Sequence, residues 1–290
     1  MQHSRAITRK SASNLALAFV LLPKPKRDAM SALYAFCREV DDVADEDSSP
    51  AGQRRQELAR WRADIKLACD NQEPELPVNI ELRPVIQKYS LPFALFDELI
   101  KGCEMDLETM RYENFDQLEL YCYRVASVVG LLSINIFGHQ NPGARDYAIS
   151  LGKALQFTNI LRDVSNDAAR GRIYLPQSEL KKFNVSENDI LEGRYSESFH
   201  ALAESVAARA RSFYSAARAA LPPEDRQSMV AAELMGTVYW RLLEKLEVAR
   251  FDVFSGPLKL SKAQKLFIVF QSYLRFWLGS RTGNYANSRS

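Results

Sequence analysis

Two aspartates and two other polar side chains recur at helical spacing within the acidic segment 34–46. The four are separated by four, three and four residues: Tyr34, Arg38, Asp41 and Asp45. On a helix these positions share one face, where carboxylates one turn apart repel each other, so the pair favours a bound cation. Magnesium prefers such oxygen ligands and bridges carboxylates to substrate phosphates. The segment alone also fits a solvated acidic helix end, because Glu46 and Asp47 extend the acidic run.

A second segment, 155–167, repeats this geometry with two amides and two carboxylates. The polar positions are Gln156, Asn159, Asp163 and Asp167. Their neighbours Phe157, Ile160 and Val164 are apolar, so the polar groups need partners inside the fold. Two such helices facing each other would bring together four carboxylates able to hold magnesium ions and one or two diphosphates. Nearby arginines provide candidate phosphate contacts: Arg38, Arg162, Arg170 and Arg172.

The third informative segment, 121–133, begins with Tyr121 and combines an apolar helical face with a face of small residues. The small residues are Ala126, Ser127, Gly130 and Ser133. A small-residue groove accommodates either a neighbouring helix or a hydrocarbon chain at close range. Both interpretations remain open from the sequence.

The elements that must position these segments are helical throughout. Prolines separate long stretches whose apolar residues recur every three or four positions, and alternating strand patterns and glycine-rich dinucleotide loops are not seen. We predict a single all-α domain over residues 1–290, with flexible ends at 1–10 and 281–290. The predicted helices are 26–46, 52–70, 79–89, 92–110, 115–138, 143–168, 197–220, 224–250 and 261–279.

Composition narrows the class of protein. The formal net charge of +2 gives no argument for nucleic acid binding. Four cysteines without a CxxC spacing and three scattered histidines favour reduced thiols and no zinc site. The N-terminus lacks a signal-peptide pattern, and the apolar run 15–22 is too short to span a bilayer, so we expect a cytoplasmic protein.

The C-terminal region has a charge of its own. After Asp252 the sequence contains six Lys or Arg residues and no Asp or Glu, interspersed with Leu266, Phe267, Phe270 and Tyr273. We expect this region to contact the anionic inner face of a membrane peripherally. The alternative is a last core helix over 261–279 whose apolar residues surround it, followed by a disordered tail.

The three segments in combination resemble the squalene and phytoene synthases. The resemblance runs from about Ser11 to the helix near 279. It is carried by Tyr34-Ala-Phe-Cys-Arg-Glu-Val-Asp-Asp42, Tyr121-Cys-Tyr-Arg-Val-Ala126, Asn159-Ile-Leu-Arg-Asp163 and Arg170-Gly-Arg-Ile-Tyr-Leu-Pro176. A bare DDxxD motif occurs in other prenyltransferases and in terpene cyclases, whereas the long final motif does not. One departure is Ser127, which replaces a common glycine.

The resemblance implies an isoprenoid-synthase-type helical bundle around a central hydrophobic tunnel. It implies Mg²⁺ as the cofactor, bound by Asp41, Asp45, Asp163 and Asp167, which also count as catalytic residues. It places Tyr121 near the carbocation and proton-transfer steps. The substrate-binding residues it implies are Tyr34, Arg38, Gln156, Asn159, Arg162, Arg172, Tyr174 and Tyr239.

The implied chemistry joins two prenyl diphosphates head to head. One diphosphate ionises, the allylic cation alkylates the second substrate, and proton loss closes a cyclopropane. The motifs most resemble bacterial presqualene diphosphate synthases of hopanoid pathways, which predicts two farnesyl diphosphate molecules as substrates and squalene-forming enzymes downstream. The alternatives are a phytoene synthase, a complete squalene or dehydrosqualene synthase, and a non-catalytic assembly factor.

Overall fold

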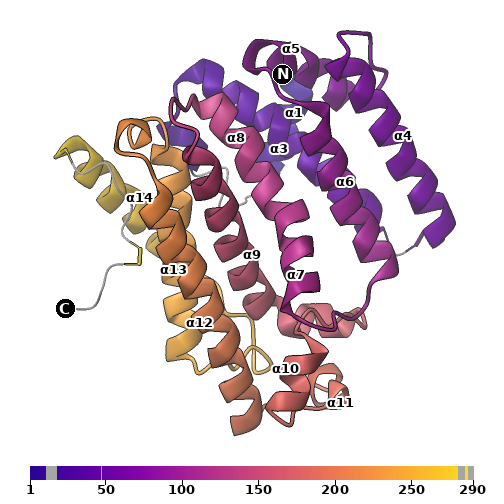
Figure 1. Ribbon diagram of the computed structural model, residues 1–290, viewed down its shortest axis with the longest axis vertical. Coiled ribbons are helices and arrows are strands. Elements are labelled where there is room, and N and C mark those ends of the chain that lie inside the picture. Colours follow the sequence, from indigo (N-terminus) through magenta and orange to yellow (C-terminus); the bar gives the residue numbers. More distant parts are fainter. Residues whose placement is uncertain (11–17, 47, 280–284, 287–290) are drawn as a thin grey trace.

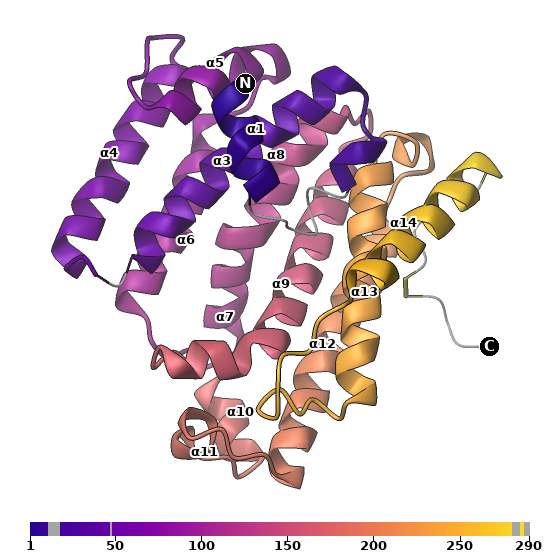
Figure 2. The same ribbon diagram turned by 180° about the vertical axis from the view of Figure 1, so that it is seen from behind.

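The structure is a computed structural model that describes residues 1–10, 18–46, 48–279 and 285–286. Within these residues the chain is helical, and its one extended pairing is an isolated parallel bridge between Arg111 and Ile173. Figures 1 and 2 show long helices lying side by side, with α7 to α9 between the N-terminal helices and the pair α12 and α13. The predicted all-α class is confirmed.

The elements are α1 (Gln2–Lys10), η1 (Phe19–Leu21), α3 (Lys24–Asp45), α4 (Ala51–Cys69), α5 (Pro77–Tyr89), α6 (Phe93–Glu108), α7 (Phe115–Cys122), η2 (Tyr123–Ser127), α8 (Val128–Phe137), α9 (Ala144–Ala169), α10 (Gln177–Lys182), α11 (Glu187–Leu191), α12 (Glu197–Ala220), η3 (Pro223–Asp225), α13 (Val230–Val248) and α14 (Lys262–Trp277).

Prolines and short polar side chains define where the helices begin. Pro23, Pro50 and Pro92 are the residues immediately before α3, α4 and α6, and Pro77 occupies the first turn of α5. Proline fits these positions because the first turn of a helix needs no backbone N–H donor. The side chain of Ser196 caps α12 by accepting a hydrogen bond from the backbone amide of Phe199.

The first ten residues differ from the prediction of a flexible end. They form α1, which packs against α3 and α5. Glu81 of α5 accepts hydrogen bonds from the backbone amides of His3 and Ser4, at 3.1 and 2.9 Å. These bonds satisfy donors that a helix N-terminus leaves free. Of the predicted flexible range 281–290, only 285 and 286 lie within the described residues.

The predicted helix 115–138 is continuous but not uniform. Five residues, Tyr123–Ser127, form a π turn between α7 and α8. Helix α9 approaches the π turn closely: a Cβ on Gly152 would lie 2.5 Å from the Cα of Ser127. The segment Phe115–Phe137 is long enough to span a membrane, and an 18-residue window within it has a mean hydropathy of 1.5. However, 56% of that window is buried within the bundle. It is therefore a core helix of this fold.

Other boundaries also differ from the sequence prediction. The helix predicted from 224 begins at Val230, because the prolines at 222 and 223 lead into the short 3-10 turn η3. Helices α10 and α11 were not predicted. They contain six and five residues, too few to show a clear apolar period.

Helix α14 is not a core helix, contrary to the alternative in which its apolar residues surround it. Among the side chains of α14 that the structure describes, Ile268 and Ser272 are the buried ones. The large apolar side chains instead share one outward face, 39–65% exposed: Leu266, Phe267, Phe270, Tyr273 and Leu274. In Figure 2 the helix crosses the outside of α13.

Candidate active site

The two predicted aspartate pairs face one polar cavity of about 120 Å³. Helix α3 contributes Asp41 and Asp45, and α9 contributes Asp163 and Asp167. The cavity is also lined by Asp106, Tyr121, Gln156, Asn159, Ile160, Arg170, Arg172 and Tyr174. Ten of the residues singled out from the sequence therefore lie together, and Asp41 and Asp45 at the end of α3 face a cavity that they share with α9.

Arginines compensate one aspartate of each pair. Asp45 accepts from the Nη1 atoms of Arg170 and Arg172 at 3.1 and 3.0 Å. Asp163 forms a two-point ion pair with the neighbouring Arg162. Arg172 is buried, with 9% of its side chain exposed, so its charge is poorly screened by solvent. The cavity thus contains both carboxylates and cations that can meet phosphate.

In the other aspartate of each pair, Asp41 and Asp167, the ionised form is disfavoured. Burial raises the pKa of Asp41 to about 7, and repulsion from Asp45 adds to the rise. Burial likewise raises the pKa of Asp167 to about 7, with a further contribution from Asp163. Ionised carboxylates crowded in this way are stabilised by an added cation.

The donor set fits magnesium if substrate oxygens complete the coordination. Among the described residues, no cluster of three or more His, Cys, Asp or Glu side chains could hold a metal ion by itself. Helices α3 and α9 each provide two carboxylates. The Oδ1 atom of Asn159 is buried and has no hydrogen-bond partner among the residues that the structure describes. Magnesium is commonly held by one or two carboxylates, water and substrate phosphates, which matches these oxygens.

Asp106, a buried carboxylate that was not predicted from the sequence, accepts a hydrogen bond from the predicted site residue Tyr121. Asp106 of α6 accepts a hydrogen bond from Tyr174 at 2.7 Å and one from Tyr121 at 3.1 Å. Burial raises the pKa of Asp106 to about 6, against the opposing effects of Tyr174 and Arg172. Asp106 shares a helical face with the buried residues Leu99, Gly102 and Cys103. A carboxylate on an otherwise apolar helical face is the sequence pattern that could have identified Asp106 as a site residue.

Two loops fix Arg172 and Tyr174 beside this carboxylate. The backbone amide of Ile173 donates to the carbonyl of Met110 at 3.1 Å, which forms the isolated bridge. Arg111 donates from Nη1 to the carbonyl of Gly171 at 2.6 Å. Gly171 has a φ of 74°, a conformation that favours glycine. The bridge stacks Tyr112 on Tyr174 with ring centroids 5.7 Å apart.

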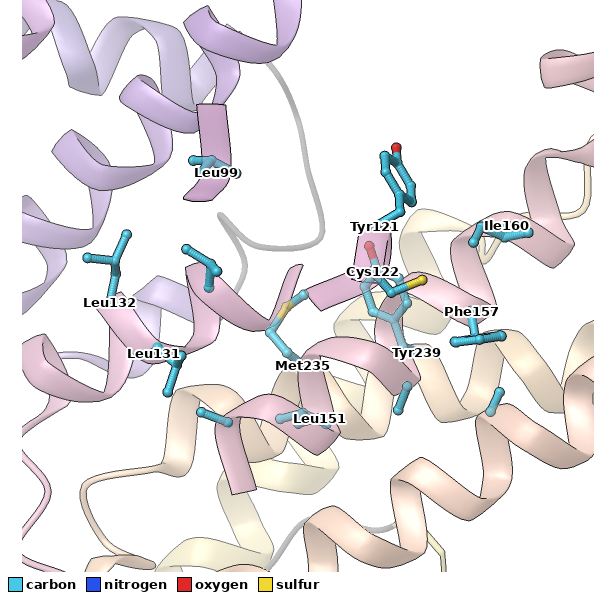
Figure 3. Close-up of a cluster of buried hydrophobic side chains, with 14 of the residues drawn as sticks. Leu99, Tyr121, Cys122, Leu131, Leu132, Leu151, Phe157, Ile160, Met235 and Tyr239 are labelled. Atoms are coloured by element: carbon cyan, nitrogen blue, oxygen red, sulfur yellow. The ribbon is translucent and has the colours of Figure 1, made fainter. Parts of the chain in front are cut away.

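An apolar cavity of about 210 Å³ adjoins the polar one, and both are lined by Gln156 and Asn159. Its walls come from η1, α3, η2, α8, α9 and α13, and Tyr239 of α13 lies at its edge. Figure 3 shows the buried side chains where α6 to α9 meet α13. Part of the small-residue face lines this cavity, and part packs against a neighbouring helix. Ala126, Gly130 and Ser133 line the cavity, while the Oγ atom of Ser127 donates to Ile149 of α9 at 2.7 Å.

Three predicted site residues do not line either cavity. Tyr34 packs edge-on against Phe19 with centroids 6.5 Å apart. Arg38 is 45% exposed and pairs with Asp42 at 2.5 Å, with Asp41 at a longer 3.5 Å. Arg162 forms the ion pair with Asp163 described above.

Comparisons with known proteins give the family. The squalene/phytoene synthase family model matches residues 8–264. A presqualene diphosphate synthase of Rhodopseudomonas palustris is 36% identical over 260 residues, covering 89% of this chain and 92% of that protein. A phytoene synthase of Arthrospira platensis is also 36% identical, covering 93% and 91%. A crystal structure of a dehydrosqualene synthase in complex with a ligand superposes with a TM-score of 0.83 at 28% identity, covering 96% of each chain. With its two aspartate helices facing one cavity, this chain belongs to the squalene/phytoene synthase family.

Proposed function

We propose that this chain condenses two molecules of farnesyl diphosphate head to head and releases presqualene diphosphate. The observation that carries the proposal is the junction of the two cavities at Gln156 and Asn159. A charged diphosphate fits the polar cavity, while its hydrocarbon tail enters the apolar one. The presqualene diphosphate synthase of Rhodopseudomonas palustris, which is similar over most of its length, supports this choice of product.

The aspartates and the arginines of the polar cavity have different roles in binding the diphosphates. Asp41, Asp45, Asp163 and Asp167 would hold Mg²⁺. When bound, Mg²⁺ neutralises charge on the departing diphosphate. Arg170 and Arg172 already lie within 3.1 Å of Asp45, so they can turn toward phosphate oxygens with little movement.

Tyr121, which lines the polar cavity, acts on the reacting part of the substrate. Its phenol is buried and held by Asp106, and burial raises its pKa well above the ordinary value for tyrosine. The phenol therefore stays protonated and can donate a hydrogen bond during the rearrangement or proton-transfer steps. Apolar walls exclude water that would capture a carbocation.

A second candidate function is phytoene synthesis from two geranylgeranyl diphosphates. The phytoene synthase of Arthrospira platensis, also 36% identical, is the observation that favours it. A complete squalene or dehydrosqualene synthase would use the same carboxylates. A non-catalytic assembly factor accounts less well for four aspartates directed into one cavity.

The proposed setting is the cytoplasm, where the farnesyl substrate is water-soluble through its diphosphate. The cyclopropyl product retains one diphosphate and requires a second ionisation before it becomes a hydrocarbon. Squalene-forming enzymes that perform this ionisation are therefore the proposed downstream partners.

Product analysis tests the proposal. The purified protein is incubated with farnesyl or geranylgeranyl diphosphate, with magnesium or EDTA, and with or without NADPH. We expect presqualene diphosphate from the farnesyl substrate, dependent on magnesium and unchanged by NADPH.

Each other outcome identifies a different function. Phytoene from the geranylgeranyl substrate as the main product supports the second candidate. Squalene formed only with NADPH identifies a complete squalene synthase. A folded protein that releases no diphosphate from either substrate supports the assembly factor.

A further inference from the structure

The outward face of α14 is an unusual surface for a folded chain. We call Leu266, Phe267, Phe270, Tyr273 and Leu274 the α14 face. Single exposed apolar side chains are normal, but neighbouring aromatic and aliphatic side chains on one helix mark an interaction site. Here they are 39–65% exposed, whereas Ile268 on the opposite side is 6% exposed. The helix therefore rests on the bundle through a small contact and directs its apolar surface outward.

The charge around this face has one sign. From Val253 to Gly279 the chain contains Lys259, Lys262, Lys265 and Arg275 and no acidic residue. Lys262 lies in the first turn of α14 and is exposed, and Arg275 lies in the last turn. Basic residues bordering an apolar helical face are typical of helices that lie in the headgroup region of anionic bilayers.

The α14 face also lies near the site already described. Helix α14 packs against α13, and α13 lines the apolar cavity with Ala231, Met235 and Tyr239. Lys265 in the first turn of α14 lies near Arg162 of α9. Its pKa is lowered by partial burial and then by the charges of Arg162 and Lys259. A surface bound through α14 would therefore lie beside the cavity that accommodates hydrocarbon.

We infer that the α14 face docks onto an anionic lipid bilayer. The aromatic and aliphatic side chains enter the boundary between headgroups and acyl chains, while the exposed Lys259 and Lys262 contact lipid phosphates. The docking is reversible, because one short amphipathic helix inserts only shallowly. It holds independently of which prenyl product the chain makes. Its use is to let an oily product pass from the cavity to the bilayer over a short distance.

Vesicle sedimentation with the full chain tests the inference. The probes are vesicles of phosphatidylcholine alone and of phosphatidylcholine with phosphatidylglycerol, at low and high salt. We expect sedimentation with the anionic vesicles at low salt, a reduced amount at high salt, and little with neutral vesicles.

Two double variants separate the α14 face from general surface hydrophobicity. Phe267→Ser with Phe270→Ser removes two exposed aromatic rings from the face. Ile80→Ser with Val248→Ser removes two apolar side chains that are 51% and 86% exposed elsewhere. We expect the first pair to weaken vesicle binding about tenfold or more, the control pair to bind as wild type does, and both to retain turnover in detergent solution.

A charge variant completes the set. Lys262→Gln should weaken binding to anionic vesicles and leave the small binding to neutral vesicles unchanged. Equal recovery of wild type in the supernatant with both kinds of vesicle overturns the inference. So does a wild-type dimer that the Phe267 and Phe270 substitutions convert to a monomer without any vesicle binding, because the face then covers a second copy of the chain.

Discussion

Replacing Asp41 by asparagine should remove activity and at the same time stabilise the metal-free protein. The substitution preserves size and shape but deletes a charge that burial and Asp45 disfavour. The amide is a poor ligand for magnesium, so turnover should fall about 100-fold or more. Loss of function and gain of stability from one substitution distinguish a functional carboxylate from a structural one.

The size of the gain follows from the pKa. A rise from 3.8 to about 7 corresponds to about 4 kcal/mol, at about 1.4 kcal/mol per pH unit. The side chain is 49% exposed to the open cavity, so solvent screening reduces this value. We expect Asp41→Asn to increase the free energy of unfolding by about 1–2 kcal/mol at about pH 7.5 in EDTA.

The pH dependence has a defined sign. Because the folded-state pKa of Asp41 is raised, the folded protein binds this proton more tightly than the unfolded chain does. The wild-type protein therefore gains stability from this group as the pH falls from about 7 toward about 4. The advantage of Asp41→Asn should be full above pH 7 and should vanish near pH 4, where both side chains are neutral.

Urea unfolding followed by circular dichroism, with EDTA present, measures the effect. Asp42→Asn is the matched control, since Asp42 lies one residue further along α3 and makes an exposed ion pair with Arg38. It should change the free energy of unfolding by less than about 1 kcal/mol and retain most of the activity. A destabilised Asp41→Asn, or one as active as the Asp42 control, would refute the reasoning.

Three further predictions address the rest of the site. Tyr121→Phe should bind substrate normally but lose about 10²–10⁴-fold in turnover, measured by steady-state kinetics and product profile, and an unchanged rate would reduce the phenol to a packing group. Asp106→Asn should lower the turnover number more than it raises KM, because it disturbs the hydrogen bond that orients Tyr121; equal effects on both would argue for general disruption of the cavity. Gly152→Ala should cost about 1–3 kcal/mol in a urea melt because its Cβ would overlap the backbone of Ser127, whereas Gly52→Ala, with nothing within 4 Å, should be neutral or stabilising.

The polar cavity could be predicted from the sequence because most of the carboxylates and amides that line it come from two helices with local periodicity. A stripe such as Gln156, Asn159, Asp163 and Asp167 is visible in one window of the chain, and its apolar neighbours imply burial. Prolines marked most helix starts for a similarly local reason: proline constrains the backbone wherever it occurs.

What could not be predicted depends on contacts between distant segments. Asp106 joins the site through hydrogen bonds from Tyr121 and Tyr174, which are 15 and 68 residues away in sequence. The bridge at Arg111 and Ile173 joins two short loops that show no strand pattern. For α14, the spacing of the apolar residues did not indicate whether the α14 face packs against the bundle or is exposed to solvent. Periodicity identifies an apolar face but not what that face contacts.

The π turn at Tyr123–Ser127 sets the rotational register between the two halves of the segment 115–137. Upstream, α7 aims Tyr121 at Asp106, and downstream, α8 directs Leu131 and Leu132 into the core. Each residue of an α-helix turns the chain by about 100°. The π turn, with its i→i+5 hydrogen bonds, contains one residue more than an α-helical turn. Deleting one of its residues, such as Ala126, would let the segment close as a regular α-helix in which Tyr121 and the core leucines keep their orientations. A second deletion in the same segment would have no extra residue to remove, so it would rotate Tyr121 by about 100° relative to the core leucines and away from Asp106.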